Sequence, residues 1–223
     1  MRAVFLAVFV ALVAAAGADA RVPRVLVTGD SMMLLTDRYL KLDLERGGLA
    51  TVRRDLRVST GLSKPHLLDW PAHARTQAER RRPDVVIATL GANDGYPIRG
   101  ARCCTQRWTA RYATRARRLL LAWSRAGRAK VYWLTLPAPN DARLGRQFDA
   151  VNAAFTRAAR GVPSAAIVDL RPVISPFGFS ERMTIAGVDE QIRSDDGVHL
   201  WWPGARLAAN VVLDRLRADG VIG

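Results

Sequence analysis

Cysteine is scarce in this chain: its 223 residues include only Cys103 and Cys104, which are adjacent. No histidine or further cysteine stands at a metal-ligand spacing from them, which argues against a zinc site or a catalytic thiol. Neighbouring Cα atoms lie about 3.8 Å apart across a trans peptide, closer than the ~4.4–6.8 Å usual in disulfides. A vicinal disulfide, buried free thiols and an intermolecular bridge are all compatible with the sequence.

Long hydrophobic runs are also scarce, and the only one stands at the N-terminus. Arg2 precedes an apolar run over 3–17, and Ala18-Asp19-Ala20 has the small-x-small form of a cleavage site. This is the pattern of a secretory signal peptide. The run is shorter than the ~20 residues that span a bilayer, which disfavours an uncleaved anchor. We therefore expect a signal peptide at 1–20, a mature chain of 21–223, and a secreted or periplasmic protein.

The mature chain contains no linker, internal repeat or low-complexity tract. Its length suffices for one hydrophobic core and is short for two. Residues 21–223 are therefore expected to form a single domain.

Lysine is rare as well, with Lys41, Lys64 and Lys130 as its only occurrences, so the net charge of +14 comes almost entirely from arginine. Such a charge favours anionic partners, for example acidic envelope polymers or lipid head groups. The alternative is that the arginines are ordinary solvated residues on helix faces. They are scattered rather than gathered in one basic arm, so nucleic acid is not expected as a partner.

Five strand-length apolar runs alternate with helical patterns along the mature chain. The runs cover 24–28, 49–58, 84–90, 130–136 and 165–170, and the helical stripes cover 108–123, 144–155 and 204–219. The second run is more polar than the others, which is typical of a strand near a sheet edge. This alternation predicts the α/β class, as a three-layer α/β/α sandwich with a central five-stranded parallel sheet. In such sheets ligands bind at the carboxyl ends of the strands.

Three short motifs follow the first three predicted strands. Ser31 ends a Gly29-Asp30-Ser31 turn after the first strand, where an unpaired N–H and the helix dipole favour a developing negative charge. An ordinary N-cap is the alternative interpretation. Gly61 follows the second strand, and Asn93 lies in Gly91-Ala92-Asn93-Asp94 after the third. The N–H groups of these two residues are suited to hold an oxyanion, although each motif alone is a common turn.

Near the C-terminus, Asp196 and His199 stand three positions apart. The carboxylate can hold the Nδ1–H of the imidazole so that Nε2 faces a nucleophile. The competing interpretation is a metal site built from Asp94, Asp195, Asp196 and His199, but one imidazole without a thiolate suits zinc poorly. We therefore expect no metal and no other cofactor.

Together, and in this order, the motifs resemble the four sequence blocks of the SGNH (GDSL-like) hydrolases. The matching segments are 29–31, Gly61, 91–94 and 196–199, which span nearly the whole mature chain. The resemblance implies the flavodoxin-like SGNH hydrolase fold. It also implies Ser31 as nucleophile, His199 as general base and Asp196 as the acid that orients it. The implied oxyanion hole consists of the N–H groups of Ser31 and Gly61 and the side chain of Asn93.

The residues around these blocks bear on the substrate. Met32 and Met33 follow Ser31, so the Gly-x-Ser-x-Gly elbow of α/β-hydrolases is absent, and the first of them replaces the leucine of many SGNH proteins. Met32 is expected to place a soft apolar group beside the site. Tyr96 and Trp201 lie near the same predicted edge and can stack on a sugar ring, or else cover the core.

The segments 61–65, 68–70 and 193–199 further resemble an exported SGNH branch, similar to the SGNH parts of envelope polysaccharide O-acetyltransferases. We therefore expect a serine esterase that removes short acyl groups, acetyl above all, from an acylated small molecule or envelope carbohydrate through an acyl-serine. One alternative is an O-acyltransferase that works with a membrane acyl-donor partner. Another is a non-catalytic envelope-binding domain, which the complete set of Ser31, Asp196 and His199 disfavours.

Overall fold

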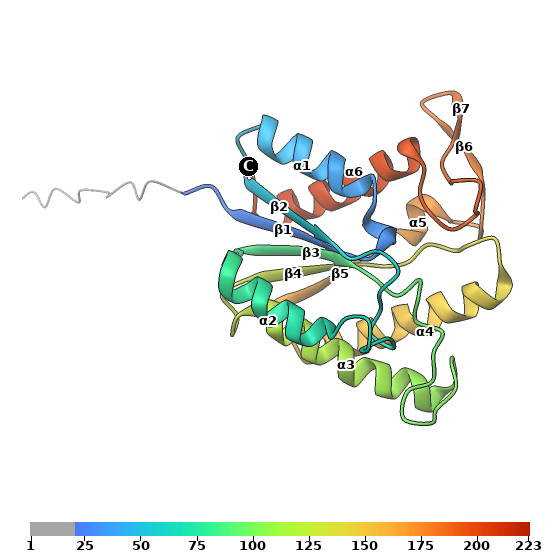
Figure 1. The fold of residues 1–223 in the computed structure, drawn as a ribbon. Helices are drawn as coiled ribbons and strands as arrows, with labels where there is room; N and C mark the ends of the chain where they lie inside the picture. The colour runs from blue at the N-terminus through green and yellow to red at the C-terminus, as the bar shows by residue number, and fades with distance from the viewer. Residues whose placement is uncertain (1–20) are drawn as a thin grey trace, which may run out of the picture.

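A five-stranded parallel sheet forms the centre of the molecule (Figure 1). The computed structural model describes residues 21–223, and the predicted signal peptide at 1–20 lies outside the described residues. The strand order is β2-β1-β3-β4-β5, and every neighbouring pair is parallel. The strands are β1 (Arg24–Gly29), β2 (Thr51–Leu56), β3 (Val85–Thr89), β4 (Lys130–Leu134) and β5 (Ala165–Val168). The predicted sheet is confirmed, and the more polar second run forms an edge strand.

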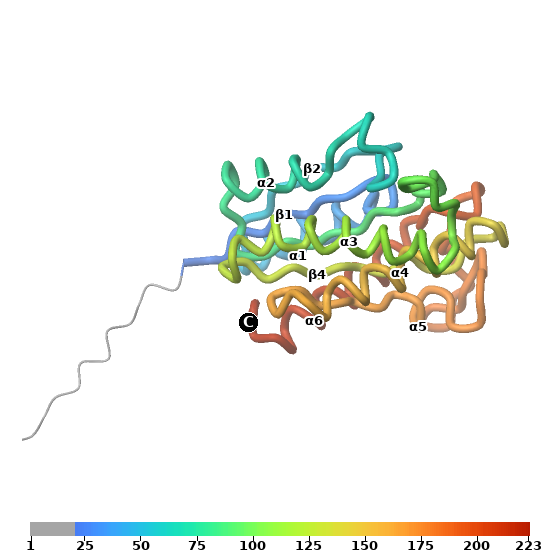
Figure 2. The backbone as a smooth tube through the Cα atoms, turned by 90° about the horizontal axis from the view of Figure 1, so that it is seen from below, coloured from blue at the N-terminus to red at the C-terminus, as the bar shows by residue number. Residues whose placement is uncertain are grey.

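Helices cover both faces of the sheet, which confirms the predicted three layers. One face carries α1 (Thr36–Arg46), the short α5 (Arg171–Ile174) and α6 (Trp202–Ala218); the other carries α2 (Trp70–Arg81), α3 (Gln106–Ser124) and α4 (Ala142–Ala159) (Figure 1). Seen from below in Figure 2, α2, α3 and α4 form a row in which α3 packs against both neighbours. Among residues 21–223, no helix is both long and apolar enough to cross a bilayer.

The strands β1, β3, β4 and β5 divide their side chains between two cores. On β1, Leu26 packs into the core beneath α2, α3 and α4, whereas Val25 and Val27 pack into the core beneath α1 and α6. This is the period of two that a strand imposes on its side chains. The predicted apolar stripe of α3 is buried as well, with Trp108 and Trp123 fully enclosed. The apolar runs of the sequence predicted these strands because a sheet covered on both faces needs apolar side chains at successive positions.

Three elements, α2 and the two strands of a hairpin, have sequence patterns too weak to predict them. Helix α2 buries small or polar side chains beside one tryptophan, so its apolar stripe is faint. The antiparallel hairpin of β6 (Arg182–Ile185) and β7 (Val188–Gln191) stands away from the sheet and is largely exposed. It projects from the body at the edge where the strands end, next to the start of α6 (Figure 1).

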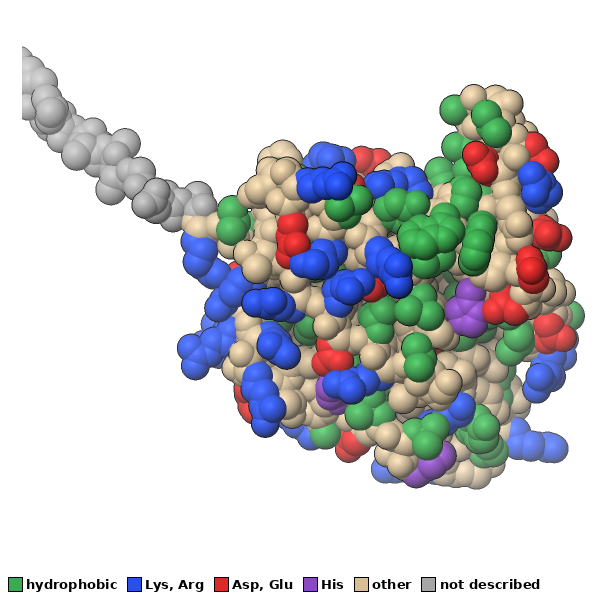
Figure 3. Space-filling view, turned by 45° about the horizontal axis from the view of Figure 1, so that its top comes forward, with side chains coloured by type: hydrophobic (Ala, Val, Ile, Leu, Met, Phe, Trp, Pro, Cys, Tyr) green, Lys and Arg blue, Asp and Glu red, His purple; other side chains and the backbone are tan. Residues whose placement is uncertain are grey.

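The charge of the surface differs between the body and this hairpin. On the face shown in Figure 3, lysine and arginine side chains are spread over the body, and acidic side chains gather at and below the hairpin. Glu181, Asp189 and Glu190 are acidic residues of this region. On this face the basic side chains are thus scattered, as the sequence predicts.

Candidate active site

Ser31 lies where β1 ends, in a 3-10 turn over Ser31–Met33. The preceding Gly29 has a φ of +146°, and a Cβ at this position would clash with the carbonyl of Thr89 on the neighbouring β3. Glycine is therefore required for the chain to turn this close to the next strand. The turn brings the serine to the carboxyl edge of the sheet, where the sequence predicted it.

Asp30 holds this turn in place. It is fully buried, and its two carboxylate oxygens accept the N–H of Met32 at 2.9 Å and the N–H of Gly91 at 2.8 Å. Burial raises the pKa of Asp30 to about 6, although these hydrogen bonds oppose the shift. The N-cap of the turn is therefore Asp30 and not Ser31, which leaves the Ser31 hydroxyl free of a capping role.

The loop between β7 and α6 brings Asp196 and His199 to Ser31. His199 Nδ1 lies 2.5 Å from Asp196 Oδ2, and His199 Nε2 lies 2.8 Å from Ser31 Oγ. The other oxygen of Asp196 accepts the N–H groups of Val198 and His199, at 2.8 and 3.0 Å. Burial opposes ionisation of Asp196, but these hydrogen bonds outweigh it and hold the pKa of the carboxyl below its ordinary value. The three residues thus form one hydrogen-bonded chain.

Gly61 and Asn93 lie on the loops that follow β2 and β3, the two neighbours of β1 in the sheet. Asn93 Nδ2 donates to the carbonyl of Thr60 at 3.1 Å, which ties the two loops together and fixes the amide. That bond uses one of the two N–H groups of the amide. Within the part of the chain that the structure describes, the backbone N–H of neither Ser31 nor Gly61 donates a hydrogen bond. Three donors are therefore free on adjoining loops at the edge that holds the Ser31–His199 pair.

A buried carboxylate, Asp94, organises the loop that carries Gly61. It accepts the N–H of Leu62 at 3.1 Å, the N–H of Ser63 at 2.5 Å and the hydroxyl of Tyr112 at 2.7 Å. Burial raises the pKa of Asp94, and these donors oppose the rise. A Cβ on Gly61 would clash with this carboxylate, which explains the glycine.

The metal set considered from the sequence does not assemble. Asp94 bonds to the loop after β2, and Asp196 bonds to His199, so the carboxylates serve different partners. Among residues 21–223, no group of three or more histidine, cysteine, aspartate or glutamate side chains is arranged to hold a metal ion.

Arg193 was not among the predicted site residues, yet it supports the loop of Asp196 and His199. Its side chain is fully buried, and its guanidinium donates to the carbonyl of Val198 at 3.0 Å and to the carbonyl of Ala138. Burial lowers the pKa of Arg193 to about 10, and the nearby Asp196 carboxylate opposes the shift. The side chain is therefore cationic at neutral pH. Nothing in the local sequence sets this arginine apart from the many exposed ones.

Of the three predicted substrate contacts, two are exposed and one is not. Tyr96 is 51% exposed and Trp201 is 44% exposed, so both offer surface to a ligand. Met32 is only 5% exposed and packs in the core beneath α2, α3 and α4. The 3-10 turn thus leaves little of the Met32 side chain open to a ligand, and its contact with substrate stays a prediction.

Several solved structures resemble this fold. A carbohydrate esterase family 3 protein from Talaromyces cellulolyticus is 18% identical, with a TM-score of 0.63 over 88% of this chain and 97% of that chain. A putative arylesterase from Agrobacterium tumefaciens is 17% identical, with a TM-score of 0.58 over 88% of this chain and 99% of that chain. A peptidoglycan O-acetylesterase is 14% identical, with a TM-score of 0.52 over 76% of this chain and 46% of that chain. No curated protein matches the sequence.

One sequence family covers most of the chain. Residues 24–215 match the family described as "Protein of unknown function (DUF459)". The matched range contains all five strands of the sheet and every predicted site residue. The protein therefore has the SGNH hydrolase fold, with the sequence blocks of that group at one sheet edge, and belongs to the DUF459 family.

Proposed function

We propose that the protein is an exported serine esterase that hydrolyses short acyl esters, acetyl esters above all, on envelope carbohydrate. The observation that carries the proposal is the chain of contacts from Asp196 through His199 to Ser31, at 2.5 and 2.8 Å. Because the carboxylate holds Nδ1–H, the lone pair of Nε2 faces the serine hydroxyl. A hydroxyl placed against an imidazole base is the arrangement that covalent acyl transfer needs.

The reaction proceeds in two displacements. Ser31 Oγ attacks the ester carbonyl while His199 Nε2 takes the hydroxyl proton. The oxyanion of the tetrahedral intermediate accepts hydrogen bonds from the N–H groups of Ser31 and Gly61 and from the Asn93 amide. Collapse expels the alcohol, which leaves with the proton from His199, and the acyl group stays on Ser31. Water then gives a proton to His199 and attacks the acyl-serine; when this second tetrahedral intermediate collapses, His199 returns the proton to Ser31 Oγ and the carboxylic acid leaves.

The exposure of the site favours hydrolysis over transfer. The side chains of His199 and Asp196 are 32% and 48% exposed, so water reaches the position where it must attack. A transferase must keep water away from its acyl-enzyme, whereas this base is partly open to solvent.

A carbohydrate substrate and export have separate support. Two similar structures carry the names of a carbohydrate esterase and a peptidoglycan O-acetylesterase. The exposed rings of Tyr96 and Trp201 are suited to stack on sugars. Export is supported by the signal-like sequence of 1–20 and by the disulfide between Cys103 and Cys104, since disulfides persist in oxidising compartments.

The test is the release of p-nitrophenol from p-nitrophenyl acetate by the mature protein and by Ser31→Ala and His199→Ala. Matched controls are Ser164→Ala and His66→Ala, which change the same residue types outside the site. The proposal predicts steady turnover by the wild type and both controls, and background rates for the two site variants.

Two outcomes contradict the proposal. Activity that survives in folded Ser31→Ala rules out this nucleophile. A single stoichiometric burst of p-nitrophenol without turnover contradicts hydrolysis and favours the acyltransferase.

A further inference from the structure

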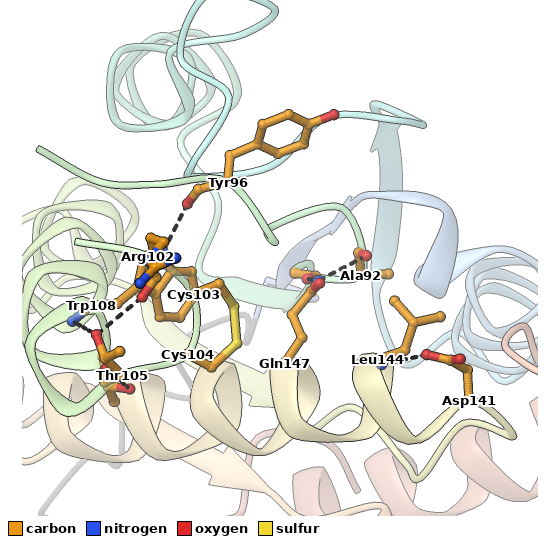
Figure 4. The surroundings of a disulfide bond; sticks show 12 residues. Ala92, Tyr96, Arg102, Cys103, Cys104, Thr105, Trp108, Asp141, Leu144 and Gln147 are labelled. Carbon is orange, nitrogen blue, oxygen red and sulfur yellow. Dashed lines mark hydrogen bonds between the residues drawn. A yellow bond between two sulfur atoms is a disulfide. The ribbon is translucent and has the colours of Figure 1, made fainter. Parts of the chain in front are cut away.

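A hollow lies near the loop that carries Asn93. It is a pocket of about 770 Å³ between the start of α3 and the outer face of α4. We call it the disulfide pocket, because the bonded pair Cys103 and Cys104 forms part of its wall. Figure 4 shows this pair above α4, at the level of the Gln147 side chain. The pocket thus faces a helix that also touches the catalytic loops.

The disulfide pocket shares a wall with the loop that carries Asn93. Gln147 Nε2, from α4, donates to the carbonyls of Gly91 and Ala92 at 2.8 and 2.9 Å, and Figure 4 shows the side chain reaching up to Ala92. Gln147 and Gly95 both line the pocket. Asn93 lies between these contacts in the chain, so one short loop forms part of the pocket wall and also carries the proposed oxyanion donor.

The lining of the pocket is strongly cationic. Arg143, Arg146 and Arg157 line it from α4, against one acidic side chain, Asp149. Within residues 21–223, none of these arginines forms an ion pair or a side-chain hydrogen bond. Guanidinium groups without a protein partner, set around one hollow, favour an anionic ligand.

The disulfide gives the same pocket an apolar side. Cys103 and Cys104 are half-buried and pack against the core beneath α2, α3 and α4. Because the two residues are adjacent and bonded, their sulfur atoms form a small fixed surface of soft, polarisable atoms. An apolar wall opposite cationic groups suits a ring that carries a negative charge.

We propose that the disulfide pocket binds the anionic sugar unit next to the ester, so that the enzyme prefers acylated acidic carbohydrate to acylated neutral carbohydrate. The predicted substrate preference rests on the proposed esterase function, whereas binding of the anion to the pocket does not. The recognised group is an anion on a sugar ring, either a carboxylate or a phosphate. Arg143 and Arg146, which lie one turn apart at the Asn93 end of α4, bind this anion. Asp149 weakens its binding, because the carboxylate repels it.

The kinetic test compares O-acetylated oligogalacturonate with O-acetylated galacto-oligosaccharide, which lacks the carboxylates. The wild type is expected to show the higher kcat/KM on the acidic substrate. Arg143→Gln and Arg146→Gln should each reduce that preference about fivefold, the effect of one exposed ion pair. Arg81→Gln, an exposed arginine at the far end of α2, is the matched control and should leave it unchanged. Hydrolysis of p-nitrophenyl acetate should be the same in all of these variants.

The binding test is independent of catalysis. Calorimetry with Ser31→Ala measures the affinity for oligogalacturonate, for glucose 6-phosphate and for neutral galacto-oligosaccharide. Tighter binding of either anion, lost in the arginine variants and strengthened by Asp149→Asn, supports the pocket and identifies the anion. Equal affinity for all three ligands, or equal losses in Arg81→Gln, overturns it.

The two proposals fail in different ways. If the pocket is wrong, p-nitrophenyl acetate is still hydrolysed through Ser31 but the enzyme shows no charge preference. If the esterase function is wrong, no ester is turned over, while the calorimetric result still decides whether the pocket binds anions.

Discussion

Arg193 offers a sharp test of how the loop of Asp196 and His199 is held. The perturbation is Arg193→Met, which keeps an unbranched apolar side chain and removes the guanidinium. The carbonyls of Val198 and Ala138 then lose their donor. The Val198 carbonyl stands in the peptide group directly before His199, so its movement moves the imidazole.

The magnitudes predict a small change in stability. Each buried carbonyl left without a donor costs about 1–3 kcal/mol. Against this, burial lowers the pKa of Arg193 well below its ordinary value, to about 10, so the folded protein keeps this cation at a cost of about 3 kcal/mol. Because methionine is uncharged, the variant no longer carries this cost of burying a cation. The net change in unfolding free energy is therefore expected to be within about 3 kcal/mol.

The expected change in activity is larger. A displacement of about 1 Å of a catalytic group can cost about 10²-fold in rate, so kcat on p-nitrophenyl acetate should fall by at least about tenfold with little change in KM. Arg193→Lys keeps the charge but cannot reach both carbonyls, and should be intermediate. The assay is steady-state kinetics on protein whose folded fraction is measured by denaturant unfolding. Unchanged kcat in a folded Arg193→Met protein would refute the positioning role.

Three further changes test neighbouring parts of the site. Asn93→Ala removes a proposed oxyanion donor and should lower turnover of p-nitrophenyl acetate by about 10²–10³-fold; a loss below threefold contradicts that role. Gly61→Ala places a Cβ against the Asp94 carboxylate and should lower the unfolding free energy by about 1–3 kcal/mol. Chemical denaturation measures this change, and unchanged stability would contradict the clash. Burial raises the pKa of Asp30 from 3.8 to about 6, so its ionisation opposes folding and its contribution to stability falls as pH rises from 4 to 6. The wild type should therefore lose about 2 kcal/mol relative to Asp30→Asn between pH 4 and pH 7, and a constant difference in unfolding free energy across this range contradicts the buried, proton-binding state of Asp30.

The sheet and the main site residues could be predicted because their signals are local. A strand buried on both faces leaves an apolar run, and the turn after it leaves a short polar motif such as Gly29-Asp30-Ser31. Asp196 and His199 are close in sequence, so their pairing needs only one loop. The contact of His199 with Ser31 spans 168 positions. It could be predicted only through the resemblance to the SGNH sequence blocks, which implies Ser31 as nucleophile and His199 as its base.

The supporting residues could not be predicted, because their roles depend on contacts between distant loops. Arg193 bonds to Ala138, 55 positions away, and Gln147 bonds to Gly91, 56 positions away. Burial of these two side chains could not be predicted, because arginine and glutamine are usually exposed. The burial of Met32 could not be predicted either, because its closeness to Ser31 in the chain does not say which way a 3-10 turn points its side chain.

The central claim is that Ser31 is a nucleophile activated by His199. The most direct measurement is the intact mass of the mature protein after reaction with diisopropyl fluorophosphate, followed by peptide mapping. The account predicts a single phosphoryl adduct on Ser31 that is absent from Ser31→Ala and forms much more slowly in His199→Ala. A folded wild-type protein that takes up no adduct, or that carries it on another serine, would contradict the account.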